Sequence, residues 1–173
     1  QRRHVGAFGA AEGDELVGAV ITKAGDELVL STAKGMAIRF PESDARPMGR
    51  DTSGVRGIKL GSGDRLVGMV VADPDATLLT VCENGYGKRT PFGTGKPLSG
   101  PAADDAGDAG DEPATEAGGE GDAEGDEGSS GMRYRTQHRG GKGIRDIKTT
   151  SRNGQVVAVV SVRDEDQVLM MTA

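Results

Sequence analysis

The hydrophobic positions of this chain fall into short runs that polar turns separate. The first four runs are "ELVGAVIT" at 15–22, "ELVLSTA" at 27–33, "GMAIRF" at 35–40 and "GVRGIKL" at 54–60. They are rich in β-branched residues and are bounded by Gly, Asp and Asn. No run keeps an apolar stripe of helical period over ten residues, and each internal glycine would cost a helix about 1 kcal/mol. The pattern predicts an all-β fold with at most one helical turn, within residues 41–49.

The same runs recur along the chain. "EGDELVGAVI" at 12–21 returns as "SGDRLVGMVV" at 62–71, and "NGQVVAVVSV" at 153–162 has the same form. Likewise, "RDTSGVRGIKL" at 50–60 aligns with "RGGKGIRDIKT" at 139–149. Four short strands in each unit of about 40–50 residues are typical of a propeller blade. We therefore expect a β-pinwheel or propeller-like repeat of four-stranded blades.

The repeat gives one domain over 1–173 that we interpret as part of a longer array. The expected units are about 1–15 (partial), 16–65, 66–160 (with an insert) and 161–173 (partial). The insert, residues 97–131, carries eleven acidic residues and no Lys or Arg. It holds too little apolar surface to offset a backbone entropy of about 1–2 kcal/mol per residue, so we expect it to be disordered.

The formal net charge of −6 averages two different regions. Without the acidic insert, 16 acidic and 21 basic residues remain, a net charge of +5. In "RGIK" at 56–59 and "RDIK" at 145–148, the period of a strand turns the isoleucine inward and the lysine outward. Basic residues at the same place in successive blades form a stripe that suits a polyphosphate backbone, although each charge alone also fits an ordinary solvated surface. The candidate DNA-binding residues are Arg39, Arg46, Arg50, Arg56, Lys59, Lys88, Arg89, Arg133, Arg135, Arg139, Lys142, Arg145 and Lys148.

The loop "HRGGKG" at 138–143 has two interpretations that the residues leave open. Its three glycines supply a tight turn with positive φ. Alternatively, the missing side chains let a phosphate approach backbone N–H groups while Arg139 and Lys142 supply charge. A disordered RNA-binding tail is disfavoured, because a predicted strand follows at once and the chain has a single copy of the motif.

Catalytic chemistry finds little support in the sequence. The carboxylates outside the insert show no paired arrangement for acid–base work, and His4 and His138 lack partners for metal binding or nucleophilic catalysis. The glycines at 61–68 precede a strand and no helix, so they do not form a dinucleotide site. Cys82 is expected to be a small buried hydrophobe. No apolar run approaches the ~20 residues of a membrane helix, and we expect a soluble, cytoplasmic protein.

Three motifs together carry a resemblance to a known family. "RPMGRDTSGVRGIKL" at 46–60, "NGYGKRTPF" at 84–92 and "QHRGGKG" at 137–143 resemble the C-terminal domain of the DNA gyrase A subunit. The last motif is similar to the family's gyrase A box, Q-R-R-G-G-K-G, with His138 in place of Arg. The family's box belongs to the first blade, whereas this copy lies in a later one. The box-like loop consists of Gln137, His138, Arg139, Gly140, Gly141, Lys142 and Gly143.

The resemblance implies a six-bladed β-pinwheel whose blades exchange strands. It also implies a basic rim that binds and wraps double-stranded DNA without sequence specificity, supporting ATP-dependent negative supercoiling by a type IIA topoisomerase. Implied partners are the gyrase A catalytic core and the gyrase B subunit, with no membrane, in the cytoplasm and on the chromosome. The catalytic tyrosine lies outside this chain, since Tyr86 and Tyr134 do not match it. No cofactor is expected here, although the whole enzyme would use ATP and Mg²⁺.

Two alternatives to this function stay open, as does the role of the insert. The alternatives are a protein-binding β-propeller scaffold and the C-terminal domain of the topoisomerase IV A subunit. The scaffold would need an apolar or aromatic face, and the chain has three Phe, two Tyr and no Trp. The insert either competes with DNA for the basic surface or is a tolerated surface insertion.

Overall fold

The computed structural model describes residues 15–45, 47, 54–93 and 134–171. In this part, seven strands form two antiparallel sheets, and Glu42–Asp44 form a short 3-10 turn. The all-β prediction and the expected helical turn are confirmed. The predicted disorder of the acidic insert concerns residues outside this part, as do the DNA-binding candidates Arg46, Arg50 and Arg133.

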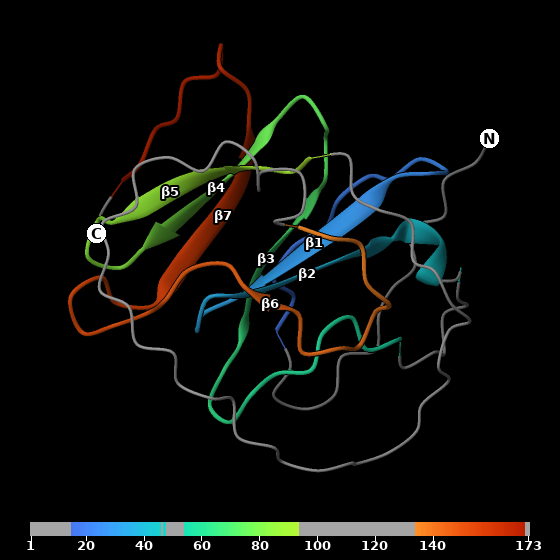
Figure 1. Ribbon diagram of the computed structural model, residues 1–173, viewed down its shortest axis with the longest axis horizontal. Coiled ribbons are helices and arrows are strands. Elements are labelled where there is room, and N and C mark those ends of the chain that lie inside the picture. The colour runs from blue at the N-terminus through green and yellow to red at the C-terminus, as the bar shows by residue number, and fades with distance from the viewer. Residues whose placement is uncertain (1–14, 46, 48–53, 94–133, 172–173) are drawn as a thin grey trace.

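The first sheet is a four-stranded blade with the order β3-β1-β2-β6 (Figure 1). Strands β1 (Glu27–Thr32) and β2 (Met36–Pro41) form a hairpin. Strand β3 (Leu66–Val71) pairs with β1, and β6 (Ile144–Arg145) pairs with β2. Both edges of this sheet therefore come from segments that follow the hairpin in the sequence, and β6 reaches it from beyond the β4–β5 hairpin.

The second sheet has the order β5-β4-β7. Strands β4 (Thr77–Cys82) and β5 (Gly87–Pro91) form its hairpin, and β7 (Val156–Val162) pairs with β4. The β4–β7 ladder shifts register at its end, as the β1–β3 ladder does. In each sheet, then, the first strand of the hairpin pairs with a strand that comes later in the sequence, and the ladder shifts register at its end. Figure 1 shows β7 next to β3, where the two sheets meet.

Two of the predicted strands are not strands in the structure. Residues 15–22 pair with no other described strand, and Leu16 and Ile21 are exposed. Residues 54–60 bury Ile58 against the first sheet, but only the stretch around Gly57 bonds to residues 140–141. The prediction was wrong because a short apolar run rich in β-branched residues indicates only a preference for extended structure, whereas a strand also needs a partner along its whole length.

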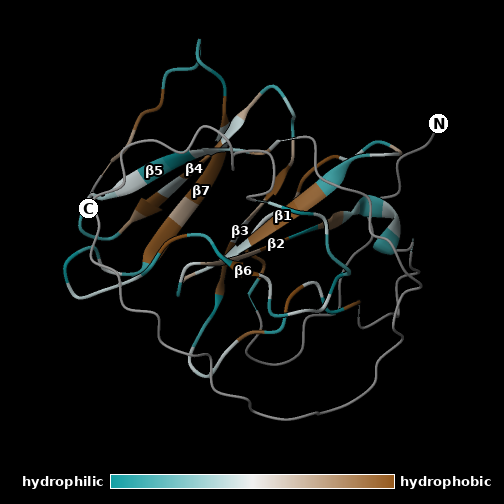
Figure 2. Ribbon diagram, in the orientation of Figure 1, coloured by the Kyte–Doolittle hydropathy of each residue, from teal (hydrophilic) through white to brown (hydrophobic). Residues whose placement is uncertain are grey.

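The first sheet buries both of its faces. Because successive residues of a strand point to opposite sides, Val29 joins one core while Leu28 and Leu30 join another. Figure 2 shows hydrophobic residues concentrated along β1, β4 and β7. The core between the sheets consists of Val29, Ala37, Val70, Ala72, Ala76, Leu78, Phe92 and Tyr134. The outer core consists of Leu28, Leu30, Ile38, Phe40 and Ile58.

Cys82 is buried at the end of β4, which confirms its predicted place in the interior. Burial raises the pKa of the thiol, and the carboxylates of Asp146 and Glu83 raise it further. Since the thiolate is the reactive form, we expect iodoacetamide at pH 8 to leave the folded protein unmodified and to alkylate Cys82 in denaturant. Mass spectrometry measures both states. Alkylation of the folded protein at the rate of a free thiol would contradict this placement.

Candidate nucleic-acid interface

The box-like loop, residues 137–143, lies against the first sheet and is held by its backbone. The N–H of Gln137 donates to the carbonyl of Arg39 (2.7 Å), and the N–H of Gly140 donates to the carbonyl of Gly57 (2.7 Å). Gly141 accepts a third bond, from the N–H of Lys59 (2.8 Å). A loop tied at three points presents its side chains in defined positions.

Gly143 supports the structural interpretation of the glycines in this loop. Its φ is +76°, and an added Cβ would lie 2.4 Å from the carbonyl oxygen of Ala37. Gly25 has a φ of +90° with open space around it. Position 143 therefore requires glycine for its conformation and also for a close approach to β2.

The two glycines give a matched pair of variants. Gly143→Ala and Gly25→Ala both place alanine at positive φ, but only the first also pushes against β2. We expect Gly143→Ala to lower the free energy of unfolding by about 1–3 kcal/mol more than Gly25→Ala does. Urea denaturation of the two variants measures the difference. Equal losses would contradict the close approach.

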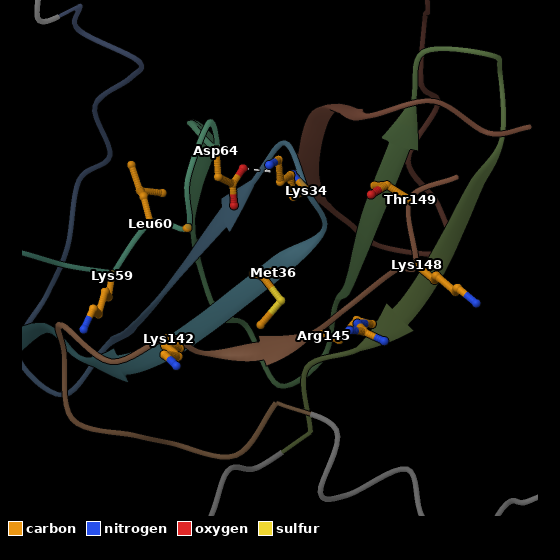
Figure 3. A pocket seen from close by; sticks show the side chains of 10 residues that line it. Lys34, Met36, Lys59, Leu60, Asp64, Lys142, Arg145, Lys148 and Thr149 are labelled. Carbon is orange, nitrogen blue, oxygen red and sulfur yellow. Dashed lines mark hydrogen bonds between the residues drawn. The ribbon is translucent and has the colours of Figure 1, made fainter. Parts of the chain in front are cut away.

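A pocket of about 520 Å³ opens beside the box-like loop. Figure 3 shows that the basic side chains of the pocket lie around Met36. They belong to the β1–β2 turn, the segment after Ile58, the box-like loop and the chain from β6 onward. Its lining includes Met36 and Leu60 and a single acidic residue, Asp64. Asp64 Oδ1 accepts hydrogen bonds from the backbone N–H groups of Lys34 (2.9 Å) and Arg65 (2.8 Å). The basic lining residues are Lys34, Lys59, Lys142, Arg145 and Lys148.

Backbone contacts bring these separate segments together. Met36 pairs with Arg145 across the β2–β6 ladder. The carbonyl of Gly35 accepts bonds from the N–H groups of Asp146 (2.8 Å) and Ile147 (3.2 Å). Five basic residues and one acidic residue around one hollow give a positive potential that attracts anions. Lys and Arg form strong, charge-assisted hydrogen bonds with phosphate groups.

The structure brings four of the predicted DNA-binding residues together in the pocket and leaves others exposed elsewhere. Arg89 pairs with Asp164 (2.8 Å). Arg139 donates from Nε to the carbonyl of Asp44 (2.8 Å) and from a terminal nitrogen to the carbonyl of Arg56 (3.3 Å), so its guanidinium anchors the loop. Within the loop, Gln137 and His138 are partly exposed. The predicted residues in the pocket are Lys59, Lys142, Arg145 and Lys148, and the other exposed ones are Arg56, Arg89, Arg135 and Arg139.

Arg39 is a correction, because the structure places it in the interior. Its side chain is 2% exposed and pairs with Glu27. One terminal nitrogen donates to the carbonyls of Phe92 (2.7 Å), Gly93 (3.1 Å) and Tyr134 (3.3 Å). The prediction that Arg39 contacts DNA was wrong, since its guanidinium is occupied inside the protein.

Lys88, another predicted DNA-binding residue, is also engaged in an ion pair within the protein. Its ammonium lies 2.9 Å from Asp146 Oδ1, a carboxylate that is 2% exposed. The ion pair neutralises this lysine, so it adds little to the positive potential of the surface.

Lys34 is the basic pocket residue that the sequence did not predict. It lies in the β1–β2 turn, within "TAKG", and its Nζ donates to the carbonyl of Ser62 (2.6 Å). The available signal was a lysine in a hairpin turn, which by itself is typical of any exposed turn.

Other kinds of site find no support in the described part of the chain. No group of three or more His, Cys, Asp or Glu residues in it is placed to hold a metal ion. None of its helices is long and apolar enough to cross a membrane. The repeated antiparallel sheets, the later strands that complete each hairpin and the basic pocket define the class: a β-propeller-type repeat protein with an anion-attracting surface.

Comparison with known sequences places the chain in a family. The family described as "DNA gyrase C-terminal domain, beta-propeller" matches residues 26–73, 76–94 and 133–163. The chain belongs to this family. The matched residues stop before the acidic insert and resume just before Tyr134, so the match passes over the insert.

The similar proteins are much longer than this chain. It is 37% identical over 166 residues to the DNA gyrase A subunit of Escherichia coli (strain K12), covering 96% of this chain and 14% of that protein. It is 33% identical over 168 residues to the DNA gyrase A subunit of Staphylococcus aureus (strain MRSA252), covering 96% of this chain and 15% of that protein.

Solved structures give the same fold. A structure of the DNA gyrase A C-terminal domain superimposes with a TM-score of 0.55 at 25% identity, covering 82% of this chain and 36% of that one. The C-terminal domain of DNA topoisomerase IV superimposes with a TM-score of 0.54 at 17% identity, covering 82% of this chain and 32% of that one. The fold is therefore common to both enzymes, and the sequence similarity favours gyrase.

Proposed function

We propose that this chain binds double-stranded DNA on the basic surface around the pocket and wraps it as part of a DNA gyrase A protein. The observation that carries the proposal is that five basic residues line one pocket beside the box-like loop. The names of the similar proteins support DNA gyrase as the enzyme.

The chemistry of the pocket suits a phosphate backbone. Lys and Arg neutralise phosphates and release condensed counterions, a contact that carries no base identity. Bending a site of 20–30 base pairs by 40–90° costs of order 1–6 kcal/mol, and several such contacts offset this cost. Wrapping requires this basic surface to continue over neighbouring blades.

The remaining parts of the activity would lie elsewhere in a full-length enzyme. The proposed partners are the gyrase A catalytic core and the gyrase B subunit, while ATP and Mg²⁺ would act outside this chain. We propose that the protein works in the cytoplasm on the chromosome, where its substrate is found.

Binding to unrelated duplexes tests this function. Fluorescence anisotropy with two labelled duplexes of equal length and different sequence is expected to give equal affinities, because phosphate contacts read no bases. A strong preference for one duplex would contradict phosphate-based binding. Wrapping is tested on closed circular DNA relaxed in the presence of the protein, where a change in linking number is expected. An unchanged linking number would contradict wrapping.

A further inference from the structure

Asp146 is a buried carboxylate within the most basic segment of the described chain. Its neighbours Arg145 and Lys148 line the pocket, whereas its own side chain is 2% exposed. In the sequence repeat, "RDIK" at 145–148 stands against "RGIK" at 56–59, so this acid replaces a glycine. Of these two copies, only the second carries the carboxylate, and the pocket lining does not include it.

The contacts of Asp146 join the two sheets. On the first sheet, its N–H donates to the carbonyl of Gly35 (2.8 Å), in the β1–β2 turn. On the second sheet, its carboxylate accepts a hydrogen bond from Thr80 Oγ1 of β4 (2.7 Å) and pairs with Lys88 of β5 (2.9 Å). The hydroxyl of Tyr134 donates to the same carboxylate.

We infer that Asp146 is a positioning residue that sets the second sheet against the first and so fixes the path of the basic surface across both. A buried charge costs desolvation unless every lone pair is matched, so the carboxylate holds its three side-chain donors in one arrangement. Its backbone N–H meanwhile ties the segment that carries Arg145 and Lys148 to the β1–β2 turn. Figure 3 shows these two side chains at the pocket that they line.

The part of this inference that concerns DNA rests on the proposed function. Asp146 makes no phosphate contact, so changing it removes none of the phosphate contacts of the pocket, and freeing Lys88 from its ion pair adds at most one. What changes is the relative placement of the two sheets, and with it the curvature imposed on DNA that spans them. Replacing Asp146 should therefore change the bend of the bound DNA more than the affinity for DNA.

The first experiment measures the sheets without DNA. Spin labels at Ser43→Cys and Val157→Cys, in a Cys82→Ala background, report one point beside the first sheet and one on β7 of the second. Asp146→Asn is expected to broaden and shift the distance distribution from pulsed electron paramagnetic resonance. Asp164→Asn, which breaks an exposed ion pair with Arg89, should leave it unchanged. An unchanged distribution for Asp146→Asn would overturn the inference.

The second experiment measures the bend. Energy transfer between dyes at the two ends of a duplex, at saturating protein, is expected to show a smaller bend with Asp146→Asn than with the unaltered protein, while the salt dependence of affinity does not decrease. Thr80→Val removes one hydrogen-bond donor to Asp146 and keeps the shape of the side chain. This variant should also reduce the DNA bend, by a smaller amount than Asp146→Asn. Equal bends for all three proteins would overturn the inference. Absence of DNA binding by the unaltered protein would contradict the proposed function alone, since the distance measurement would still stand.

Discussion

Replacing Lys142, Arg145 and Lys148 together by glutamine is expected to cause the largest loss of DNA binding. These residues line the pocket from the box-like loop, β6 and the segment that follows β6. A charge-assisted hydrogen bond contributes about 1.5–3 kcal/mol, so each lost contact should lower the affinity by about tenfold or more. Each lost phosphate contact should also reduce the salt dependence of the affinity, by about one unit of slope. Anisotropy titrations at several salt concentrations measure both effects.

A matched variant separates the pocket from the overall charge. Lys23, Arg152 and Arg163 are exposed and lie outside the pocket lining, and their replacement by glutamine changes the net charge by the same amount. We expect this variant to keep most of the affinity and the slope. Equal losses in the two variants would show that binding follows the net charge of the domain, and would contradict a specific role for the pocket.

Replacing Arg39 by methionine is expected to cause the largest loss of stability. The change leaves Glu27 without its cation and removes the donor shared by the carbonyls of Phe92, Gly93 and Tyr134. Removing one partner of a buried ion pair costs about 3–5 kcal/mol, a large part of the roughly 5–15 kcal/mol that typically stabilises a domain. Urea denaturation followed by circular dichroism measures the change in the free energy of unfolding.

The control for Arg39→Met is a variant in an exposed ion pair of the same protein. Arg163 pairs with Asp73, and both side chains are partly exposed, at 53% and 29%. Exposed pairs contribute about 0–1 kcal/mol, so Arg163→Met should change the free energy of unfolding by no more than that. Comparable losses for Arg39→Met and Arg163→Met would contradict a structural role for the buried guanidinium.

The architecture was predictable because its signals are local. Short apolar runs mark β1, β2, β4 and β7, and glycines mark the turns between them. The repeat then predicts that distant segments have the same form. What sequence does not reveal is the partner of each strand: residues 15–22 resemble β3 in pattern, yet pair with no other strand in the described part of the chain.

The site was predictable to the extent that it follows the repeat. Lys59 and Lys148 stand at equivalent places, and both line the pocket. Arg39 was misplaced because its burial depends on Phe92 and Tyr134, which lie 53 and 95 residues away along the chain. Lys34 was missed for the converse reason, since a turn becomes part of a pocket only when other segments meet it. Both outcomes depend on long-range contacts that no local pattern encodes.

The salt dependence of DNA binding by the unaltered protein tests the central claim most directly. If the basic surface binds phosphates, the logarithm of the association constant should fall linearly with the logarithm of the salt concentration, with a slope of about −0.9 for each phosphate neutralised. With the pocket engaged, the account predicts a slope of several units between about 50 and 200 mM salt. A slope near zero over this range would contradict it.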